Sequence, residues 1–248
     1  MLTMTQEINN AFYNNEFQPY VYYGPWGYGK STLMIHTLSE VYGKYEGGKL
    51  VEVCLDWNKL KNYIFFNPKD FLSLLETLSS RNQRLKCIGW DDAGFWLFQL
   101  DYADPFVKAI SKFMQVCRPY LASVIFTSPE KTTITKQIRG MRQLYSTKIL
   151  KSNDNKYESH KYLRHARTYQ NWISEDGSKH GVWKIHEDDF SCKIPDDMFA
   201  KYQEIRKSYV DYGIMLMKKE LEMLTKRGLT TDNFTWKNLV AGEVSGTK

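Results

Sequence analysis

The chain has 248 residues, of which 42% are hydrophobic and 25% are charged, and this balance excludes an intrinsically disordered protein. Its formal net charge of +6 at pH 7 suits a polyanionic partner without requiring one. No apolar run reaches the ~18 residues that a membrane span needs, residues 1–15 lack the apolar segment of a signal peptide, and four widely spaced cysteines favour free thiols, so we expect a cytoplasmic protein that does not contact a membrane.

The first elements alternate between strand and helix. Residues 20–24 (YVYYG) predict a short strand, and apolar residues at helical spacing over 31–42 predict a helix directly after a glycine-rich loop. The β-branched run 49–57 predicts a buried strand. Asn67 followed by Pro68 is typical of the start of a helix. Strand, loop and helix in this order open an α/β pattern.

The alternation continues as far as residue 150. Residues 85–92 predict a strand that ends in two carboxylates, and 104–118 predict a helix that begins with Asp-Pro. Residues 121–129 and 144–150 predict two more strands. This order favours a parallel sheet sandwiched by helices, with the functional loops at the carboxyl ends of the strands.

The pattern changes after residue 150. Residues 162–174 and 181–190 are β-rich and joined by a turn, which predicts an antiparallel β-hairpin. A long helix is expected from Pro195 to about Lys226. We therefore predict an α/β core over residues 1–150 and an extension over residues 151–248, made of the hairpin and the long helix, that packs on or beside the core.

Residues 24–32 read GPWGYGKST and fit the pattern G-x-x-x-x-G-K-[ST] at every fixed position. Glycines allow successive backbone N–H groups to turn toward an anion, and the positive end of the following helix points at the same place. Lys30 can reach the β- and γ-phosphates, and the Ser31 hydroxyl can ligate Mg²⁺. With a strand before it and a helix after it, the segment predicts a nucleotide site rather than a plain turn. The predicted wall of the site is Gly24, Pro25, Trp26, Gly27, Tyr28, Gly29, Lys30, Ser31 and Thr32.

Two aromatic residues occupy variable positions of this loop. Trp26 and Tyr28 are unusual there, because a tight loop around a buried anion has little room for rings. We expect both rings to lean outward, toward the base, a neighbouring subunit or a strand of nucleic acid.

Two adjacent carboxylates follow the strand over residues 85–92. We expect Asp91 to hold Mg²⁺ opposite Ser31, and Asp92 to polarise the attacking water. The alternative is that the sequence DDAG only ends a strand and begins a turn. A phosphate loop upstream, at a suitable spacing, favours the catalytic interpretation.

With both motifs in place, the chain resembles P-loop NTPases of the branch in which an added strand separates the phosphate-loop strand from the acid strand. Within this branch it is similar to replication initiators and helicase loaders of the AAA-plus type. Its compact chain, rich in tyrosine and lysine, resembles ATPases of archaeal viruses and plasmids. The resemblance covers residues 17–150. It implies ATP and Mg²⁺ as ligands, and a polar residue, Thr127 or Ser128, that contacts the γ-phosphate or the water; either hydroxyl could instead cap the next segment.

The resemblance also implies a homo-oligomer, because such proteins often supply an arginine to the site of a neighbouring subunit. Arg139 and Arg142 stand where that arginine is expected, although a solvated basic turn explains them as well. The small helical lid of AAA-plus proteins has no counterpart here, since a hairpin and a long helix follow instead. This departure also admits RecA-like and packaging-motor relatives.

Basic residues concentrate in residues 131–186, which hold twelve Lys and Arg against four acids, with tyrosines and tryptophans between them. Cations for phosphates and aromatic faces for bases are the composition of a nucleic-acid surface. The alternative is that the rings pack on the sheet and the charges are solvated. The histidines of this region fit no zinc spacing and are expected to be ordinary surface residues: His160, His165, His180 and His186.

Together these features predict an ATPase whose Mg²⁺-dependent hydrolysis is coupled to work on DNA, in replication, loading, translocation or genome packaging, as an oligomer. The alternative is a nucleotide-controlled switch or scaffold that binds a protein partner and turns over slowly. A small-molecule kinase is a weaker third option, because no arginine-rich lid lies between Lys30 and Asp91. ATP is favoured over GTP because the sequence lacks an N-K-x-D motif for guanine.

Overall fold

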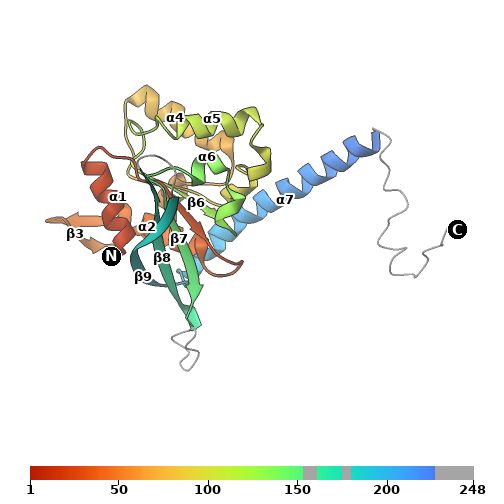
Figure 1. The fold of residues 1–248 in the computed structure, drawn as a ribbon. Helices are drawn as coiled ribbons and strands as arrows, with labels where there is room; N and C mark the ends of the chain where they lie inside the picture. Colours follow the sequence, from red (N-terminus) through yellow and green to blue (C-terminus); the bar gives the residue numbers. More distant parts are fainter. Residues whose placement is uncertain (153–160, 175–179, 227–248) are drawn as a thin grey trace. The chain divides into compact units, whose positions relative to one another are not determined.

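The structure, a computed structural model, describes residues 1–152, 161–174 and 180–226. The chain divides into two units, Met1–Phe199 and Ala200–Lys248. The first unit is an α/β fold built on a seven-stranded sheet (Figure 1). The strands, in spatial order across the sheet, are β4 (Ile64–Phe65), β5 (Ile88–Trp90), β6 (Val124–Ser128), β1 (Tyr20–Tyr23), β7 (Tyr145–Lys151), β8 (Leu163–Ile173) and β9 (His180–Ser191).

The first five strands of this order are parallel, and β8 and β9 continue the sheet as an antiparallel hairpin. The predicted fold class is therefore confirmed, including the hairpin that joins the sheet. Strand β6 lies between β1, which precedes the glycine-rich loop, and β5, which ends in the carboxylates. The expected added strand between these two is thus present.

Helices cover both faces of the sheet. Successive side chains along a strand point to opposite faces, so each strand contributes residues to both helix layers. Tyr20 and Tyr22 of β1 point to the face of α1 (Thr3–Tyr13) and α2 (Lys30–Val41), where the Tyr22 hydroxyl lies 3.1 Å from Thr37 Oγ1. On β5, Gly89 faces α2, and a Cβ at this position would collide with Met34. A glycine therefore allows the close approach of α2 to the strand.

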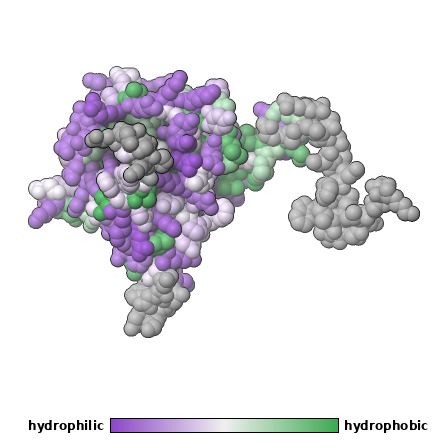
Figure 2. All heavy atoms as spheres, viewed as in Figure 1, coloured by the Kyte–Doolittle hydropathy of each residue, from purple (hydrophilic) through white to green (hydrophobic). Residues whose placement is uncertain are grey.

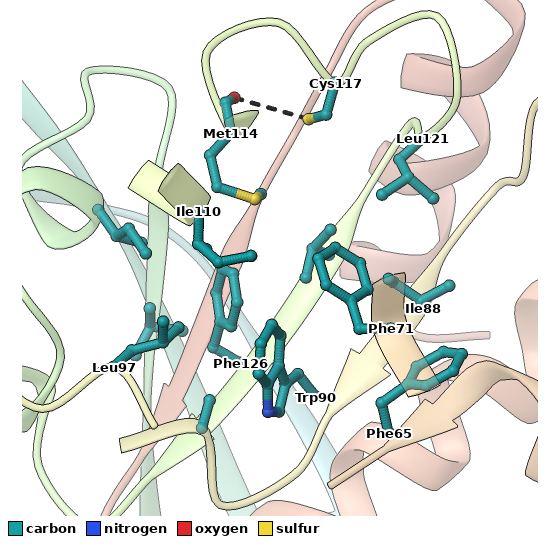
Figure 3. Close-up of a cluster of buried hydrophobic side chains, with 14 of the residues drawn as sticks. Phe65, Phe71, Ile88, Trp90, Leu97, Ile110, Met114, Cys117, Leu121 and Phe126 are labelled. Atoms are coloured by element: carbon teal, nitrogen blue, oxygen red, sulfur yellow. Dashed lines mark hydrogen bonds between the residues drawn. The ribbon is translucent and has the colours of Figure 1, made fainter. Parts of the chain in front are cut away.

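The opposite face holds the main hydrophobic core, under α4 (Pro68–Arg81) and α5 (Pro105–Phe113) (Figure 3). Phe71 of α4 packs on Trp90 of β5 with ring centroids 5.0 Å apart. Both helices begin as the sequence predicts: the Asn67 side chain accepts a hydrogen bond from the N–H of Asp70, and Asp104 accepts from the first turn of α5. Long apolar side chains from strands and helices thus meet in one cluster.

One predicted strand is wrong in its position. Residues 49–57 do not enter the main sheet; β3 (Lys49–Glu52) pairs only with β2 (Lys44–Glu46) in a separate two-stranded sheet. The run is not buried either, since Val51 of β3 and Leu55 beyond it are both more than half exposed. The strand that lies outside β5 is β4, whose two residues are too few to show a periodic pattern.

Other features agree with the sequence or extend it. All four cysteines are free, and burial raises the pKa of Cys87 and of Cys117 to about 12. Helix α1 was not predicted, because its residues are mostly polar. Among the helices of the described ranges, none combines the length and apolar character that a membrane span requires.

The long helix α7 (Asp196–Lys226) runs from the first unit into the second. It confirms the helix predicted from Pro195 to about Lys226. Figure 2 shows a largely hydrophilic surface on the first unit and apolar side chains along this helix. Among the exposed apolar residues of α7 are Val210, Met215 and Met217. The structure neither confirms nor contradicts the predicted division at residue 150, although β8 and β9 belong to the first unit. The stretch after Gly228, where the sequence also allows one short helix, falls outside the described residues.

Candidate nucleotide-binding site

The glycine-rich loop connects β1 to α2. Gly29 forms the N-cap of α2 with φ 96°, a left-handed conformation that a side chain disfavours. Gly24 lies against β7, where an added Cβ would come within 2.9 Å of the carbonyl oxygen of Ile149. A side chain at either glycine would therefore be strained or would collide with a neighbour. The N-terminal end of α2, which is the end of a helix that binds anions, faces the inside of the loop.

Lys30 and Thr32 lie in the first turn of α2. The Lys30 side chain is buried, and its Nζ donates hydrogen bonds to the carbonyl oxygens of Gly24, at 2.8 Å, and Pro25, at 3.1 Å. The ammonium group is thereby held within the curve of the loop. A lysine ammonium group in this place is of the kind that binds phosphate oxygens as a point charge.

Asp91 is the residue that ties the site together. It follows β5 directly and is fully buried. Its Oδ1 accepts a hydrogen bond from Ser31 Oγ, at 2.9 Å, and another from Thr127 Oγ1. The first turn of α2, the end of β5 and the end of β6 therefore meet at one carboxylate oxygen.

Asp92 adopts a left-handed backbone conformation, φ 49° and ψ 36°, which is uncommon for a residue other than glycine. Its N–H donates to Thr127 Oγ1 at 2.8 Å. Thr127 thus accepts from the Asp92 N–H and donates to the Asp91 carboxylate, which fixes that carboxylate and the Asp92 backbone relative to β6. Strain of this kind persists only where surrounding contacts impose it.

The next residue of β6, Ser128, has a different environment. Its hydroxyl oxygen is buried and makes no hydrogen bond with any described residue. It lies beside Gly94, where a Cβ would come within 2.8 Å of Ser128 Oγ. The sequence predicted that one of these two hydroxyls contacts phosphate or water. The Thr127 hydroxyl is already hydrogen-bonded to the Asp91 carboxylate and to the Asp92 N–H, whereas the Ser128 hydroxyl has no partner among the described residues.

The two aromatic residues of the loop have different positions. Trp26 is 80% exposed, which agrees with the expected outward orientation. Tyr28 lies under the ammonium group of Lys151, whose Nζ is 4.8 Å from the ring centroid. Tyr28 therefore packs against the end of β7, while Trp26 projects from the loop.

Arg139 and Arg142 lie in and after α6 (Lys136–Arg139), and the structure does not bring Arg139 to the loop of its own chain. Arg139 Nη2 contacts Gln99 Oε1 at 3.5 Å, and the Arg139 carbonyl accepts a hydrogen bond from Asn171. Arg142 is exposed on the turn that leads to β7. The role of either residue in a neighbouring subunit stays a prediction.

The basic character of the β8–β9 hairpin is weaker than the sequence suggested. Arg167 and Lys184 both pair with Glu187, at 2.9 Å and 3.2 Å, and His165 pairs with Asp189 at 2.5 Å. The region over residues 131–186 stops just before Glu187, Asp188 and Asp189, and including them reduces its net charge from +8 to +5. Cross-strand pairing therefore neutralises part of the predicted nucleic-acid surface.

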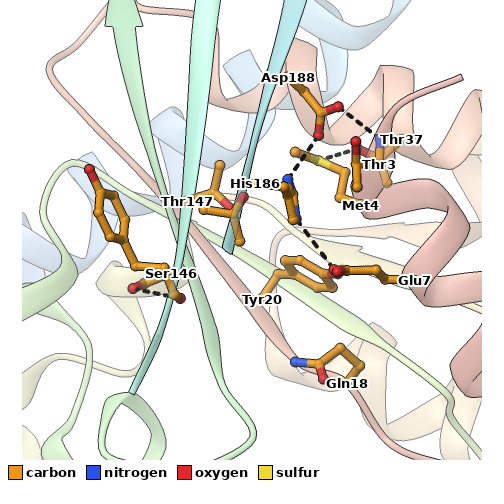
Figure 4. A network of polar contacts seen from close by, with 12 residues as sticks. Thr3, Met4, Glu7, Gln18, Tyr20, Thr37, Ser146, Thr147, His186 and Asp188 are labelled. Carbon is orange, nitrogen blue, oxygen red and sulfur yellow. Dashed lines mark hydrogen bonds and ion pairs between the residues drawn. The ribbon is translucent and has the colours of Figure 1, made fainter. Parts of the chain in front are cut away.

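His186 is a correction to the expectation of ordinary surface histidines. Its side chain is only 9% exposed and lies between Glu7 of α1, at 3.3 Å, and Asp188, at 3.2 Å (Figure 4). Burial alone lowers its pKa, but the contacts with Asp188 and Glu7 outweigh burial and raise the pKa to about 9. His160 lies outside the described residues, and within them no cluster of His, Cys, Asp or Glu is arranged to bind a metal.

The donor set of the site suits Mg²⁺, which prefers hard oxygen ligands and binds proteins through one or two carboxylates together with substrate phosphates. Asp91 supplies carboxylate oxygens and Ser31 a hydroxyl, 2.9 Å from each other and next to the glycine-rich loop. The residues present therefore fit the metal that the sequence implied.

Comparisons with known proteins add a viral relative. The chain is 27% identical over 213 residues to the uncharacterized protein B-251 of Sulfolobus spindle-shape virus 1, a match that covers 84% of this chain and 81% of the relative. No family model matches the chain. The predicted similarity to proteins of archaeal viruses is thus confirmed. The name of the relative gives no activity, so the ATPase part of that prediction stays a prediction.

Among solved structures, the chain is similar to the N-terminal domain of zonular occludens toxin from Neisseria meningitidis. The sequences are 12% identical, the match covers 69% of this chain and 95% of that domain, and the TM-score is 0.39. A TM-score this low does not establish a shared fold. The α/β assignment therefore rests on the strand order of this chain itself.

Proposed function

We propose that the protein is an ATPase that hydrolyses ATP with Mg²⁺ and couples hydrolysis to work on DNA as an oligomer. The observation that carries the proposal is the meeting of Ser31, Asp91 and Thr127 at the mouth of a G-x-x-x-x-G-K-[ST] loop. These three residues come from three separate elements, and a plain glycine-rich turn does not require them to meet.

Each residue of the site has a role in this reaction. The loop N–H groups and Lys30 bind the phosphates, and Lys30 leaves the Gly24 and Pro25 carbonyls to do so. Bound Mg²⁺, held by Ser31 and Asp91, supplies positive charge that offsets the charge of the phosphates. Thr127 keeps the Asp91 carboxylate oriented, and Asp92 polarises the water that attacks the γ-phosphate.

DNA and an oligomer form the finer part of the proposal. The positive net charge of the chain supports a polyanionic partner. For an oligomer the supporting residue is Arg142, which is exposed on the turn before β7, where it can approach the site of a neighbouring subunit. The alternative, a nucleotide-controlled switch that binds a protein, uses the same nucleotide site and differs in what stimulates turnover.

The test measures phosphate release for the wild type, Lys30→Ala and Asp92→Asn, with and without DNA. We expect each substitution to lower the rate by ~100-fold or more, because each removes a group that acts on the transferred phosphate or the water. Lys69→Ala, on the exposed first turn of α4, is the control for loss of a lysine and should keep the wild-type rate. Unchanged hydrolysis in both site variants would overturn the assignment.

The same experiment separates the two functions. Stimulation by DNA, with binding that weakens steeply as salt rises, supports the coupled ATPase. Association with a protein that depends on ATP, together with hydrolysis that DNA does not change, supports the switch. Intrinsic fluorescence of the exposed Trp26 gives an independent measure of nucleotide binding, with Trp26→Phe as its blank.

A further inference from the structure

Three connected cavities form a groove on the α5 side of the sheet, which we call the glutamine groove. Their volumes are about 680, 630 and 140 Å³, and Gln115 lines all three. Gln143 lines the first and second, and Gln137 lines the second and third. Because these pockets share lining residues, they adjoin one another, and we treat them together as one groove.

The walls of the groove come from segments far apart in sequence. One wall is the C-terminal part of α5 with the turn after it, and the other is α6 with residues 140–143. Residues 16–18, which precede β1, close one end. The groove thus lies beside the strand starts and is separate from the glycine-rich loop, which follows the carboxyl end of β1.

Four basic residues line the groove, and they are Lys108, Lys112, Arg118 and Lys136. All four are exposed, and none forms an ion pair with a described residue. Glu16 is the only acid among the described residues that line it. The hairpin differs in this respect, since Arg167 and Lys184 already share Glu187.

Three glutamines line the same groove as these cations. Gln115, Gln137 and Gln143 are exposed, and the amide groups of Gln115 and Gln143 make no hydrogen bond with the described part of the chain. A glutamine amide donates to phosphate oxygens and also both donates to and accepts from base edges. A groove lined by both cations and amides therefore fits a phosphodiester chain.

We propose that the glutamine groove is the nucleic-acid-binding surface of this protein. The inference specifies the DNA partner of the proposed function and rests on that part of it, but it requires no hydrolysis. An acidic protein segment would also meet the four cations. The glutamines favour the polynucleotide. Carboxylates only accept hydrogen bonds, so they pair with the NH₂ group of a glutamine and leave its C=O group without a donor, whereas base edges can pair with both groups.

The experiment compares three triple variants that each lower the net charge from +6 to +3. The groove variant is Lys112→Gln, Arg118→Gln and Lys136→Gln. The hairpin variant is Lys148→Gln, Arg167→Gln and Lys184→Gln, three residues that the strand pairing places on one face of the sheet. The control variant is Lys49→Gln, Lys61→Gln and Lys69→Gln, which are exposed and lie outside both surfaces.

Binding to a labelled 30-base-pair duplex and to the single strand of the same length is measured across salt concentrations without nucleotide. We expect the groove variant to bind at least tenfold more weakly than the control variant. For the duplex, its slope of log K against log[salt] should shrink by about 2–3, since each lost phosphate contact removes ~0.9. Basal ATP hydrolysis without DNA should stay at the wild-type level in the groove variant.

The outcomes separate the groove from the proposed function. If the groove variant binds as tightly as the wild type, or if only the hairpin variant loses binding, the glutamine groove is not the binding surface. DNA then stays a partner of the protein. Equal losses in all three variants show an effect of net charge alone and overturn the groove as well. A wild type that binds neither probe overturns the DNA part of the proposed function together with the groove. Preference for a polyglutamate probe over both nucleic acids would identify an acidic protein instead.

Discussion

Two neighbouring hydroxyls at the end of β6 differ in what they can do. Thr127 forms two hydrogen bonds, one as a donor to the Asp91 carboxylate and one as an acceptor from the Asp92 N–H, and it orients the Asp91 carboxylate and the Asp92 backbone. Ser128 is buried and has no hydrogen-bond partner among the described residues. Of the two hydroxyls, Ser128 is therefore the candidate proposed to contact a γ-phosphate or a water molecule, while Thr127 positions Asp91 and the Asp92 backbone.

This difference predicts two distinct phenotypes. Thr127→Val keeps the shape of the side chain but removes two buried hydrogen bonds, so we expect a loss of unfolding free energy of about 1–3 kcal/mol and at least tenfold slower hydrolysis. Ser128→Ala removes no hydrogen bond, so its unfolding free energy should stay within about 0.5 kcal/mol of wild type while hydrolysis falls. Chemical denaturation and phosphate release measure the two effects. Equal losses of stability in both variants would contradict the assignment.

At the scale of elements, a polar network attaches α1 to the outer strand β9. His186 bridges Glu7 of α1 and Asp188, and Asp188 Oδ1 accepts a hydrogen bond from the N–H of Thr3 at 2.8 Å. Tyr20 of β1 adds a hydrogen bond to Glu7 at 2.8 Å. A mostly polar helix is thus fixed to the sheet by charge and hydrogen bonds, in addition to the burial of Met4 and Ile8.

The network predicts a pH dependence of stability. Because the folded pKa of His186 is about 9 and the unfolded value is ~6.5, its stabilising effect is complete below pH ~6.5 and is lost as the pH rises through 9. We expect the unfolding free energy to fall by on the order of 2–3 kcal/mol over this range. His186→Gln should flatten this slope in denaturation experiments at pH 6, 7.5 and 9.5.

His165→Gln is the matched control, because the partner of His165, Asp189, is largely exposed. A screened surface pair contributes little to stability, so this variant should keep the wild-type slope. A slope that survives in His186→Gln would show that another group causes it. A second effect is expected at acid pH. Burial alone raises the pKa of Asp188, but the contacts with His186 and with the Thr3 N–H outweigh burial and lower it. The stabilising effect of the Asp188 carboxylate is therefore lost as the pH falls below the ordinary range of a carboxylate.

At the scale of the whole molecule, local sequence signals predicted the elements that have strong periodicity or caps. The glycine-rich loop, the strand that ends in Asp91, and the helices begun by Asn67 and Asp104 were all found where expected. Residues 49–57 failed because a β-branched run shows strand propensity but not which sheet it joins. The two residues of β4 gave no pattern at all.

Long-range pairing explains what the sequence could not give at the candidate sites. The neutralisation of Arg167 depends on the register of β8 against β9, and the burial of His186 depends on α1, about 180 residues away along the chain. The glutamine groove combines residues from three segments, none of which carries a motif. The spacing of Lys30 and Asp91, by contrast, belongs to a motif whose parts can be recognised separately.

The proposed oligomer makes the last prediction, which concerns sites shared between chains. Arg142→Ala and Lys30→Ala should each be nearly inactive alone if Arg142 completes the site of a neighbouring subunit. Mixing the two variants in equal amounts should restore about a quarter of wild-type activity, because one interface in four then combines an intact loop with an intact arginine. The control mixes Lys30→Ala with the double variant Lys30→Ala and Arg142→Ala, which has no intact loop and should stay inactive. The same mixture with Arg139→Ala tests the other arginine, and activity that mixing never restores would show that neither arginine acts between subunits.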